Sequence, residues 1–312
     1  MDSTNAKIKQ AAAALKAGGL VILPTETVYG LAADAADSRA VAAVYAAKGR
    51  PSFNPLIAHV ADVAMARRIA RFDDRAERLA AEFWPGPLTL VLPVADEVAV
   101  CDLARAGLDT VAVRSPAHPL AHALLKAFGG PLVAPSANRS GRPSPTTFAD
   151  AVDETGAAAV VVLDGGACAI GLESTVVSLL GEARLLRPGA VTRAEIEALI
   201  GPLSDAEADA RRSPGRLTRH YAPNLPLRLN VTEPRANEVW LGFGATHWPG
   251  DGAEPFNLSR EGDLAEAAAN LFAYLRAADR SGASGIAVAP IPDTGLGEAI
   301  NDRLRRAAGY VG

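Results

Sequence analysis

The sequence predicts an α/β fold in which a large, twisted mixed sheet is followed by a smaller α/β domain. Short apolar runs alternate with helix-like segments, and some runs follow each other directly, which is typical of a mixed sheet rather than of regular βαβ winding. Near residue 203 the chain turns polar and charged, and a second series of strand and helix patterns follows. We therefore expect a first domain at 1–202, a connecting segment at 203–225 and a second domain at 226–312.

In the first domain, Ser3 or Thr4 can cap a helix that runs to Lys16 and ends at two glycines. Further helices are expected at 40–47, 73–83, 119–128 and 192–200. The expected strands are 20–23, 56–60, 88–93, 109–114, 132–134 and 160–164, with another opening within 171–177. In the second domain, strands near 238–243 and 285–289 alternate with helices near 263–279 and 298–308, which indicates a compact β-α-β-α unit.

Composition limits the classes of function. The net charge of −4 argues against a protein that holds nucleic acid by electrostatics alone, but it leaves room for a small anion bound by a few local cations. The two cysteines, Cys101 and Cys168, stand far apart in no metal-ligand spacing and fit a reducing compartment. The N-terminus lacks an apolar signal region, and no apolar run reaches the length of a membrane span. We expect a cytoplasmic protein without membrane contact.

The stretch 48–59 (K-G-R-P-S-F-N-P-L-I-A-H) is the most informative loop of the chain. Its glycine and two prolines forbid regular structure between a helix and a strand, so Lys48, Arg50 and Asn54 lie on stiff backbone, with His59 at the end of the strand. Two fixed cations beside polar donors suit a polyanion such as a nucleotide polyphosphate. The alternative is a helix C-terminus whose cations offset the helix dipole, followed by an ordinary turn.

Other polar groups also follow predicted strands, where ligand sites of α/β folds commonly lie. The pattern alone leaves each of them open, because the threonines of 24–30 suit a simple turn, Arg114 suits an exposed strand end, and 135–146 suits a surface loop. The full set of hydroxyl, amide and cationic candidates is Thr27, Lys48, Arg50, Asn54, His59, Thr110, Arg114, Ser136, Asn138, Ser144, Ser174 and Arg187.

Several kinds of chemistry lack their motif. There is no G-x-x-x-x-G-K-[ST] phosphate loop, no complete dinucleotide fingerprint, no H-E-x-x-H or C-x-x-C metal motif and no G-x-S-x-G nucleophile elbow. Covalent catalysis therefore has little support. The remaining set binds and orients anions, and positioning with charge stabilisation is what phosphoryl and nucleotidyl transfer require.

These motifs, taken in order, resemble the threonylcarbamoyl-AMP synthase family in its long form, with a YrdC-like catalytic domain and a C-terminal accessory domain. The matching segments are P-T-E-T-V-Y-G, K-x-R with F-N-P-L, W-P-G-P-L-T, D-T-V-A-V-R, A-P-S-A-N, R-P-S-P-T, E-S-T-V, L-R-P-G, H-Y-A-P and G-L-G-E-A-I-N-D-R-L. They cover nearly the whole chain, and so many segments in register make a chance match negligible.

The resemblance implies a nucleotidyltransferase that makes L-threonylcarbamoyl-AMP and pyrophosphate from L-threonine, bicarbonate (or CO2) and ATP. Downstream threonylcarbamoyl-transferase proteins would pass the group to adenosine 37 of tRNA, so direct tRNA binding by this chain is expected to be weak or absent. The family's catalytic domain is a twisted mixed sheet around a deep positive cavity, and the accessory domain is Rossmann-like.

The resemblance also implies roles for residues. The K-x-R pair, Lys48 and Arg50, would be catalytic, with Lys48 and Asn138 near the phosphates or the carbamate. Threonine would be bound by Thr27, His59, Arg114, Ser136 and Ser174. ATP would be bound by Arg50, Asn54, Thr110, Ala134, Asn138, Ser144, Arg187 and Tyr221. Mg2+ would offset the polyphosphate charge, although no protein side chains for it are identified.

The segment 213–223 (S-P-G-R-L-T-R-H-Y-A-P) would reach back over the cavity as a lid, and not serve as a tether, because a closed site protects a labile mixed anhydride from water. Two other functions stay open from the residues. One is an RNA-binding module, which the acidic charge and the lack of interleaved basic and aromatic residues disfavour. The other is a threonine-independent carbamoyl-transfer domain of the hydrogenase-maturation type, which shares the fold but carries further segments that are absent here.

Overall fold

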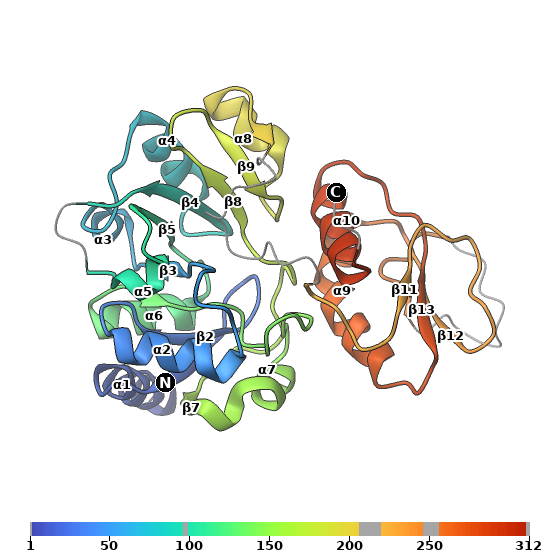
Figure 1. The fold of residues 1–312 in the computed structure, drawn as a ribbon, viewed down its shortest axis with the longest axis horizontal. Coiled ribbons are helices and arrows are strands. Elements are labelled where there is room, and N and C mark those ends of the chain that lie inside the picture. The colour runs from blue at the N-terminus through green and yellow to red at the C-terminus, as the bar shows by residue number, and fades with distance from the viewer. Residues whose placement is uncertain (1, 96–98, 206–219, 246–255, 310–312) are drawn as a thin grey trace.

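The computed structural model describes residues 2–95, 99–205, 220–245 and 256–309. Figure 1 shows two lobes side by side along the longest axis, a larger N-terminal domain and a smaller C-terminal one. Both combine helices with a sheet, so the predicted α/β class is confirmed. Within the described residues no helix is both long and apolar enough to cross a membrane.

A ten-stranded mixed sheet forms the centre of the N-terminal domain. Its spatial order is β10-β9-β8-β4-β5-β3-β6-β2-β1-β7, and parallel and antiparallel neighbours are interspersed. The strands are β1 (Leu20–Leu23), β2 (Gly30–Asp34), β3 (Ile57–His59), β4 (Leu88–Pro93), β5 (Thr110–Arg114), β6 (Leu132–Val133), β7 (Ala159–Val162), β8 (Thr175–Ser178), β9 (Arg184–Arg187) and β10 (Ser204–Asp205). The predicted mixed sheet is thereby confirmed.

Helices α1 (Asp2–Lys16), α2 (Ser38–Lys48), α4 (Asp74–Phe83), α6 (Pro119–Phe128) and α8 (Arg193–Ile200) match the expected helices to within two residues at each end, apart from the start of α1. Their caps explain the agreement: Asp37, Asp73 and Thr192 each accept a hydrogen bond from the first turn of the helix that follows. Not expected from the sequence were the short helices α3 (Val63–Arg67), α5 (Asp102–Arg105) and α7 (Phe148–Thr155), and the strands β2, β9 and β10. These elements are too short or too rich in alanine for hydrophobic periodicity to single them out.

The two faces of the central strands meet different surroundings. On β5, Val111 and Val113 point into the large aliphatic core shared with the helices. Ala112 points the other way, into a small apolar cluster with Val91 and Val176. Arg114 alternates onto that second face, and the register pairs it with His59 of β3. The second face therefore offers a buried polar surface to ligands.

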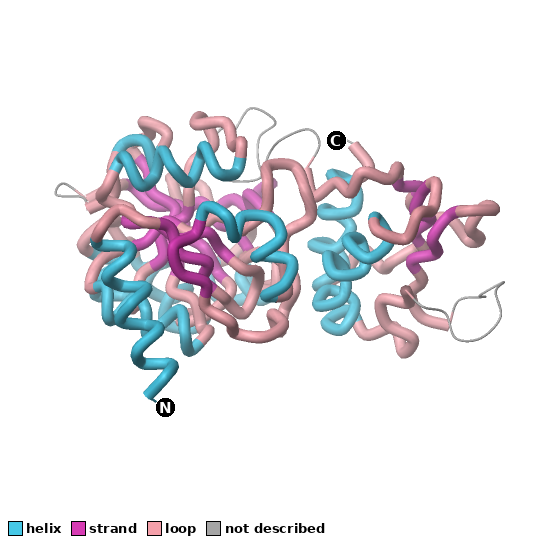
Figure 2. The backbone as a smooth tube through the Cα atoms, turned by 90° about the horizontal axis from the view of Figure 1, so that it is seen from below, coloured by secondary structure: helices cyan, strands magenta, loops and turns pink. Residues whose placement is uncertain are grey.

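The C-terminal domain has a three-stranded parallel sheet in the order β11-β13-β12, formed by β11 (Leu227–Arg228), β12 (Glu238–Leu241) and β13 (Gly285–Val288). Helices α9 (Leu264–Asp279) and α10 (Leu296–Ala307) pack on it. The predicted β-α-β-α order is present, with β11 added before it. Figure 2 shows both helices between this sheet and the N-terminal domain, so they provide the surface that faces the large domain.

The domain interface is close-packed. Gly171, which has a φ of +74°, lies so near α9 that a Cβ there would come within 2.5 Å of the Cα of Ala269. Leu172 of the N-terminal domain belongs to the core of the C-terminal one, together with Tyr221. At the expected boundary, Ser204–Asp205 pair with β9 and so extend the large sheet past residue 202. Most of the predicted lid, 213–219, lies outside the described residues, whereas His220 and Tyr221 lie within them.

Candidate active site

A cavity opens on the second face of the central sheet and extends to the domain interface. Its lining residues come from the loop after β1, the loop before β3, strands β3 and β5, the segment after β6, both ends of the β8–β9 hairpin and the start of the C-terminal segment. They are Thr27, Val28, Arg50, Pro55, Leu56, Ile57, His59, Arg114, Ala134, Pro135, Ser136, Glu173, Ser174, Arg187, His220 and Tyr221. The structure thus brings most of the predicted site residues to one place.

Arg50 and Arg187 are held by backbone carbonyl groups. The left-handed Gly49 ends α2 and turns the chain, so that Arg50 Nε and Nη2 donate to the carbonyls of Asn54 and Pro55 at 3.3 and 3.2 Å. At the end of β9, Arg187 Nε and Nη2 donate to the carbonyl of Ser174. Burial lowers the pKa of Arg50 to about 10, which still leaves it charged near neutral pH. Carbonyl oxygens satisfy guanidinium donors without cancelling their charge, so both arginines keep a net positive charge for an anion.

Arg114 is bound differently, in a buried ion pair with Glu26. Its Nη2 donates to Glu26 Oε1 at 2.5 Å, Nη1 to Thr27 Oγ1 at 2.9 Å and Nε to the carbonyl of Gly86 at 3.1 Å. Burial raises the pKa of Glu26, but Arg114 outweighs it, and the pKa ends below its usual value. A guanidinium has five N–H groups, so these three bonds leave two for a ligand carboxylate.

His59 lies beside Arg114 and is neutral near physiological pH. Burial is the main reason that its pKa falls to about 3, and the positive charge of Arg114 adds to the effect. Its Nδ1 lies 3.2 Å from the carbonyl oxygen of Ile57. A neutral imidazole that is 3 % exposed can orient a ligand by hydrogen bonding, but it adds no charge.

Lys48 supports the cavity wall from outside the lining set. Its ammonium group donates to the carbonyls of Ser136 and Asn138, which fixes the loop after β6. Burial and then the nearby Arg50 bring the pKa of Lys48 well below its usual value. Asn138 donates from Nδ2 to the carbonyls of Arg139 and Arg142, while its buried Oδ1 has no hydrogen-bond partner among the described residues. Lys48 and Asn138 therefore support the loop that carries Ser136 and do not line the cavity themselves.

Three further predicted residues do not line the cavity. Thr110 lies four residues before Arg114 on β5, so its side chain is on the same face of the strand as Arg114. Asn54 supplies its backbone carbonyl to Arg50, and its side-chain oxygen has no hydrogen-bond partner in the described chain. Ser144 donates its hydroxyl to the carboxylate of Glu173. The segment at Ala134, by contrast, lines the cavity directly.

Four residues of this site were missed by the sequence analysis: Glu26, Glu173, His220 and Arg303. Each lies inside one of the matching motifs, beside the cations and hydroxyls that were expected at the site. Glu173 is held on both oxygens, by Ser144 on Oε1 and by Arg303 on Oε2. A buried cation cluster requires such partners, which is the signal that could have identified the carboxylates.

His220 and Tyr221 cover the cavity from the C-terminal side. Tyr221 is fully buried and has a φ of +62°, an uncommon conformation for a residue with a side chain. Its ring packs against Phe272 of α9 with centroids 5.4 Å apart, and His220 lies against it at 3.9 Å. The surrounding contacts hold this strained position, as is common at functional sites.

The described residues contain no group of three or more His, Cys, Asp or Glu side chains that could hold a metal ion. The two carboxylates at the cavity, Glu26 and Glu173, are already bonded to arginines. These two carboxylates therefore carry arginine partners in place of metal ligands.

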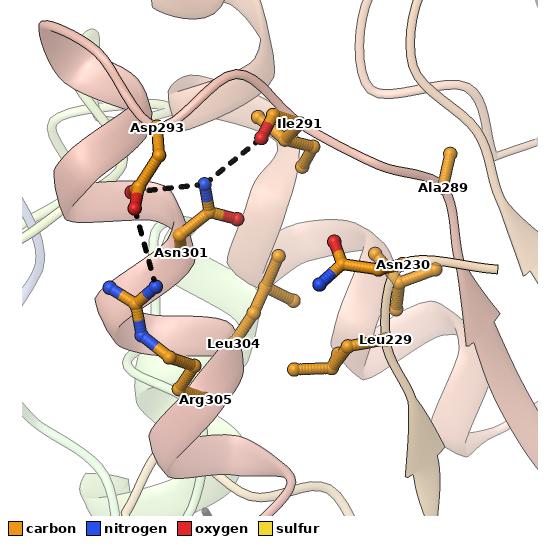
Figure 3. Close-up of a pocket in the computed structure, with 9 residues that line it drawn as sticks. Leu229, Asn230, Ala289, Ile291, Asp293, Asn301, Leu304 and Arg305 are labelled. Atoms are coloured by element: carbon orange, nitrogen blue, oxygen red, sulfur yellow. Dashed lines mark hydrogen bonds and ion pairs between the residues drawn. The ribbon is translucent and has the colours of Figure 1, made fainter. Parts of the chain in front are cut away.

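A second cavity, of about 140 Å3, lies in the C-terminal domain beside the carboxyl ends of β11 and β13. Figure 3 shows its polar groups bonded to one another: Asn301 donates to the carbonyl of Ile291 and to Asp293, and Asp293 faces Arg305 at 3.6 Å. Because these groups satisfy each other, this cavity is a weaker candidate for a ligand site than the first one.

The fold and the cavity define an α/β protein with a cation-lined cavity on one face of a mixed sheet, and comparison with known proteins narrows this class. The Sua5/YciO/YrdC family model, described as "Telomere recombination", matches residues 13–189. A second model, described as "Threonylcarbamoyl-AMP synthase, C-terminal domain", matches residues 191–309.

Full-length relatives agree with these matches. The chain is 40 % identical to the threonylcarbamoyl-AMP synthase of Bacillus subtilis (strain 168), over 99 % of this chain and 95 % of the relative. It is 41 % identical to that of Pyrococcus abyssi (strain GE5 / Orsay), over 97 % and 94 %. The crystal structure of Pyrococcus abyssi Sua5 complexed with L-threonine superposes with a TM-score of 0.90 at 39 % identity, covering 98 % and 95 %. The chain belongs to the threonylcarbamoyl-AMP synthase family, in its two-domain form.

Proposed function

We propose that this chain makes L-threonylcarbamoyl-AMP and pyrophosphate from L-threonine, bicarbonate or CO2, and ATP, in the cavity on the second face of its sheet. The product would serve threonylcarbamoyladenosine formation at position 37 of tRNA, after transfer by other proteins in the cytoplasm. Family membership supports the activity. The observation that carries the site is the convergence of three arginines on one cavity, Arg114 and Arg187 buried and Arg50 half-buried.

The chemistry needs no enzyme nucleophile. The amine of threonine attacks CO2 and loses a proton, which forms a carbamate. An oxygen of the carbamate then attacks the α-phosphorus of ATP, and the bond to the pyrophosphate leaving group breaks. The protein's part is to hold two anionic reactants together and to offset their charge.

The arginines divide between the two substrates. Arg114 has two N–H groups left over from its bonds to Glu26, Thr27 and the carbonyl of Gly86, and these suit the threonine carboxylate, with neutral His59, Ser136 and Ser174 around it. Arg50 and Arg187, which are satisfied by carbonyl groups, keep their charge for the ATP phosphates. Mg2+ enters with ATP as part of the substrate and offsets polyphosphate charge there.

Lys48 and Asn138 act in this scheme by shaping the loop that carries Ser136. Both ammonium bonds of Lys48 end on that loop, so its loss should displace Ser136 and the groups beside it. The unpartnered Oδ1 of Asn138 remains for a ligand donor or a water molecule.

The segment with His220 and Tyr221 acts as the lid. The cavity that His220 and Tyr221 help to line has a volume of about 50 Å3, below the roughly 300–1,000 Å3 of pockets for drug-sized ligands. We therefore expect the covering segment to move when ATP enters and to exclude water when it returns. Deleting the chain after Leu203, or changing His220 and Tyr221 to alanine, should reduce turnover or let the intermediate leak; unchanged turnover with full product retention would contradict a lid.

The decisive experiment measures pyrophosphate release from ATP while L-threonine and bicarbonate are omitted in turn. Release that needs both identifies the synthase, and Arg50→Ala and Arg114→Ala should then each abolish it. Release without threonine would favour a carbamoyl-transfer domain instead. If the folded protein releases no pyrophosphate in the presence of Mg2+, an RNA-binding module would be favoured. Salt-dependent tRNA binding would then test that function.

A further inference from the structure

We infer that Arg303, on α10 of the C-terminal domain, is a positioning residue for the nucleotide site. It binds the carboxylate of Glu173. This pairing prevents the negative charge of Glu173 from repelling a polyphosphate, and it prevents Glu173 from pairing with the cations that would bind the polyphosphate. The inference rests on the proposed function, and it gives the accessory domain a direct part in substrate binding.

The contact joins the two domains. Arg303 is fully buried, and its Nε donates to Glu173 Oε2 at 2.9 Å. The other oxygen of Glu173 accepts from the hydroxyl of Ser144. Among the described residues that line the active-site cavity, Glu173 is the single acidic one. An arginine from the other domain therefore neutralises the one carboxylate among these lining residues.

The charges around Glu173 show why this matters. Arg187 and Lys48 are close enough to interact with the carboxylate, and Arg187 shares the cavity lining with it. Burial alone would raise the pKa of Glu173, but Arg303 and then Arg187 outweigh it, so the group stays ionised. Without Arg303, an ionised Glu173 would turn to the remaining cations and would compete with phosphate for them.

Arg303 also supports the covering segment. Its guanidinium carbon lies 5.2 Å from the ring centroid of Tyr221, within the range of a cation–π contact. Asp302 receives a second bond from Arg303 at 2.7 Å, which fixes the guanidinium plane between the tyrosine and Glu173. One side chain thus orients both a cavity wall and the cover of the cavity.

Arg276 of α9 provides a matched control. It is 3 % exposed, and it too crosses the domain interface to a buried carboxylate, with Nη1 donating to Glu154 Oε1 at 3.0 Å. Neither Arg276 nor Glu154 lines the active-site cavity. If the two arginines only dock the domains, their loss should have the same kinetic consequence.

The test uses the full chain with Arg303→Gln, Arg276→Gln, Glu173→Gln and the double variant Glu173→Gln/Arg303→Gln. MgATP affinity is measured by calorimetry, and KM values for ATP and threonine by pyrophosphate release. Arg303→Gln should weaken MgATP binding and raise the KM for ATP at least tenfold, with the KM for threonine changed less than threefold. Arg276→Gln should stay within threefold of wild type for both. The double variant should recover most of the ATP affinity, because it removes the stranded charge.

Equal losses in the Arg303 and Arg276 variants, or no recovery in the double variant, would overturn the inference and leave Arg303 a docking residue. If Arg303→Gln does not fold, the double variant is compared with Glu173→Gln instead. An ATP affinity of the double variant more than tenfold below that of Glu173→Gln would overturn the inference. The binding measurement does not depend on turnover. Failure of the proposed function would show as wild-type protein that releases no pyrophosphate, whatever the variants bind.

Discussion

Successive residues of strand β5 point to opposite faces of the sheet, and the two faces have different roles. Val111 and Val113 bury aliphatic side chains among the helices of the large core. Thr110, Ala112 and Arg114 face the other side, where the strand ends at the ligand cavity. Because side chains alternate along a strand, one segment can contribute to stability with one face and to binding with the other. Mutations on the two faces should therefore separate folding from turnover.

The buried cations show a second difference. Arg276 and Arg303 bond to carboxylates across the domain interface, so their charge is cancelled locally. Arg50 and Arg187, which line the cavity, bond to backbone carbonyls, and this leaves their positive charge available there. A protein tolerates such charge only when donors are satisfied, and the remaining attraction is then available to an anionic ligand.

The largest effect is expected from the ligand face of β5. Arg114→Gln alone would strand the carboxylate of Glu26, so we combine it with Glu26→Gln. The double variant should lose roughly 100- to 1,000-fold in kcat/KM for threonine, since losing one charge-assisted contact to a buried carboxylate costs about 3–4 kcal/mol. Steady-state kinetics measure this, and the Tm should stay near that of wild type.

Glu26→Gln alone is the control for that experiment. It removes the ion pair but keeps Arg114 for the substrate, so it should retain far more activity than the double variant. If the double variant turns over threonine as well as the control does, Arg114 does not bind the substrate carboxylate.

A smaller effect is expected from the pH dependence of stability, and it too belongs to the ligand face. His59 has a pKa of about 3 in the fold, and burial with the nearby cations brings that of His220 well below its usual value. Below pH 6.5 the unfolded chain binds protons that the folded chain does not, so stability falls as the pH falls. Between about pH 6.5 and 5, His59 should remove about 1.5 kcal/mol from the free energy of unfolding, and His220 should act in the same direction.

Urea unfolding at several pH values measures that slope. His59→Gln should remove the contribution of His59, so the free energy of unfolding should fall less steeply over this pH range. An unchanged slope in this variant would mean that His59 takes up its proton in the folded state as readily as in the unfolded one.

Much of this architecture could be predicted from the sequence, because its elements carry local signals. The helices with aspartate or threonine caps and the apolar strands of four to six residues were expected close to their observed ends. Helix α7 and strand β2 were missed, since alanine and glycine in short runs give no clear periodicity and their structure depends on tertiary packing.

The site was predictable to a different extent. Motif register identified Arg50, Arg114 and Arg187, and the structure brings them to one cavity. It did not indicate that Glu26 and Arg303 pair with site residues, because each pairing joins segments 88 and 130 residues apart. Whether an arginine meets a carboxylate or a carbonyl is decided by the fold, and no local pattern encodes it.

The smallest effect on activity is expected from the core face of β5, at Val113. Val113→Ala deletes two methyl groups from a fully buried position and should lower the free energy of unfolding by about 2 kcal/mol. At a temperature where the variant stays folded, kcat and both KM values should change less than twofold, because the side chain points away from the cavity. Chemical unfolding and pyrophosphate release measure the two quantities in parallel. A large kinetic loss at full folding would mean that the two faces of the strand are mechanically coupled, so that packing beneath Arg114 sets its position as much as its own bonds do.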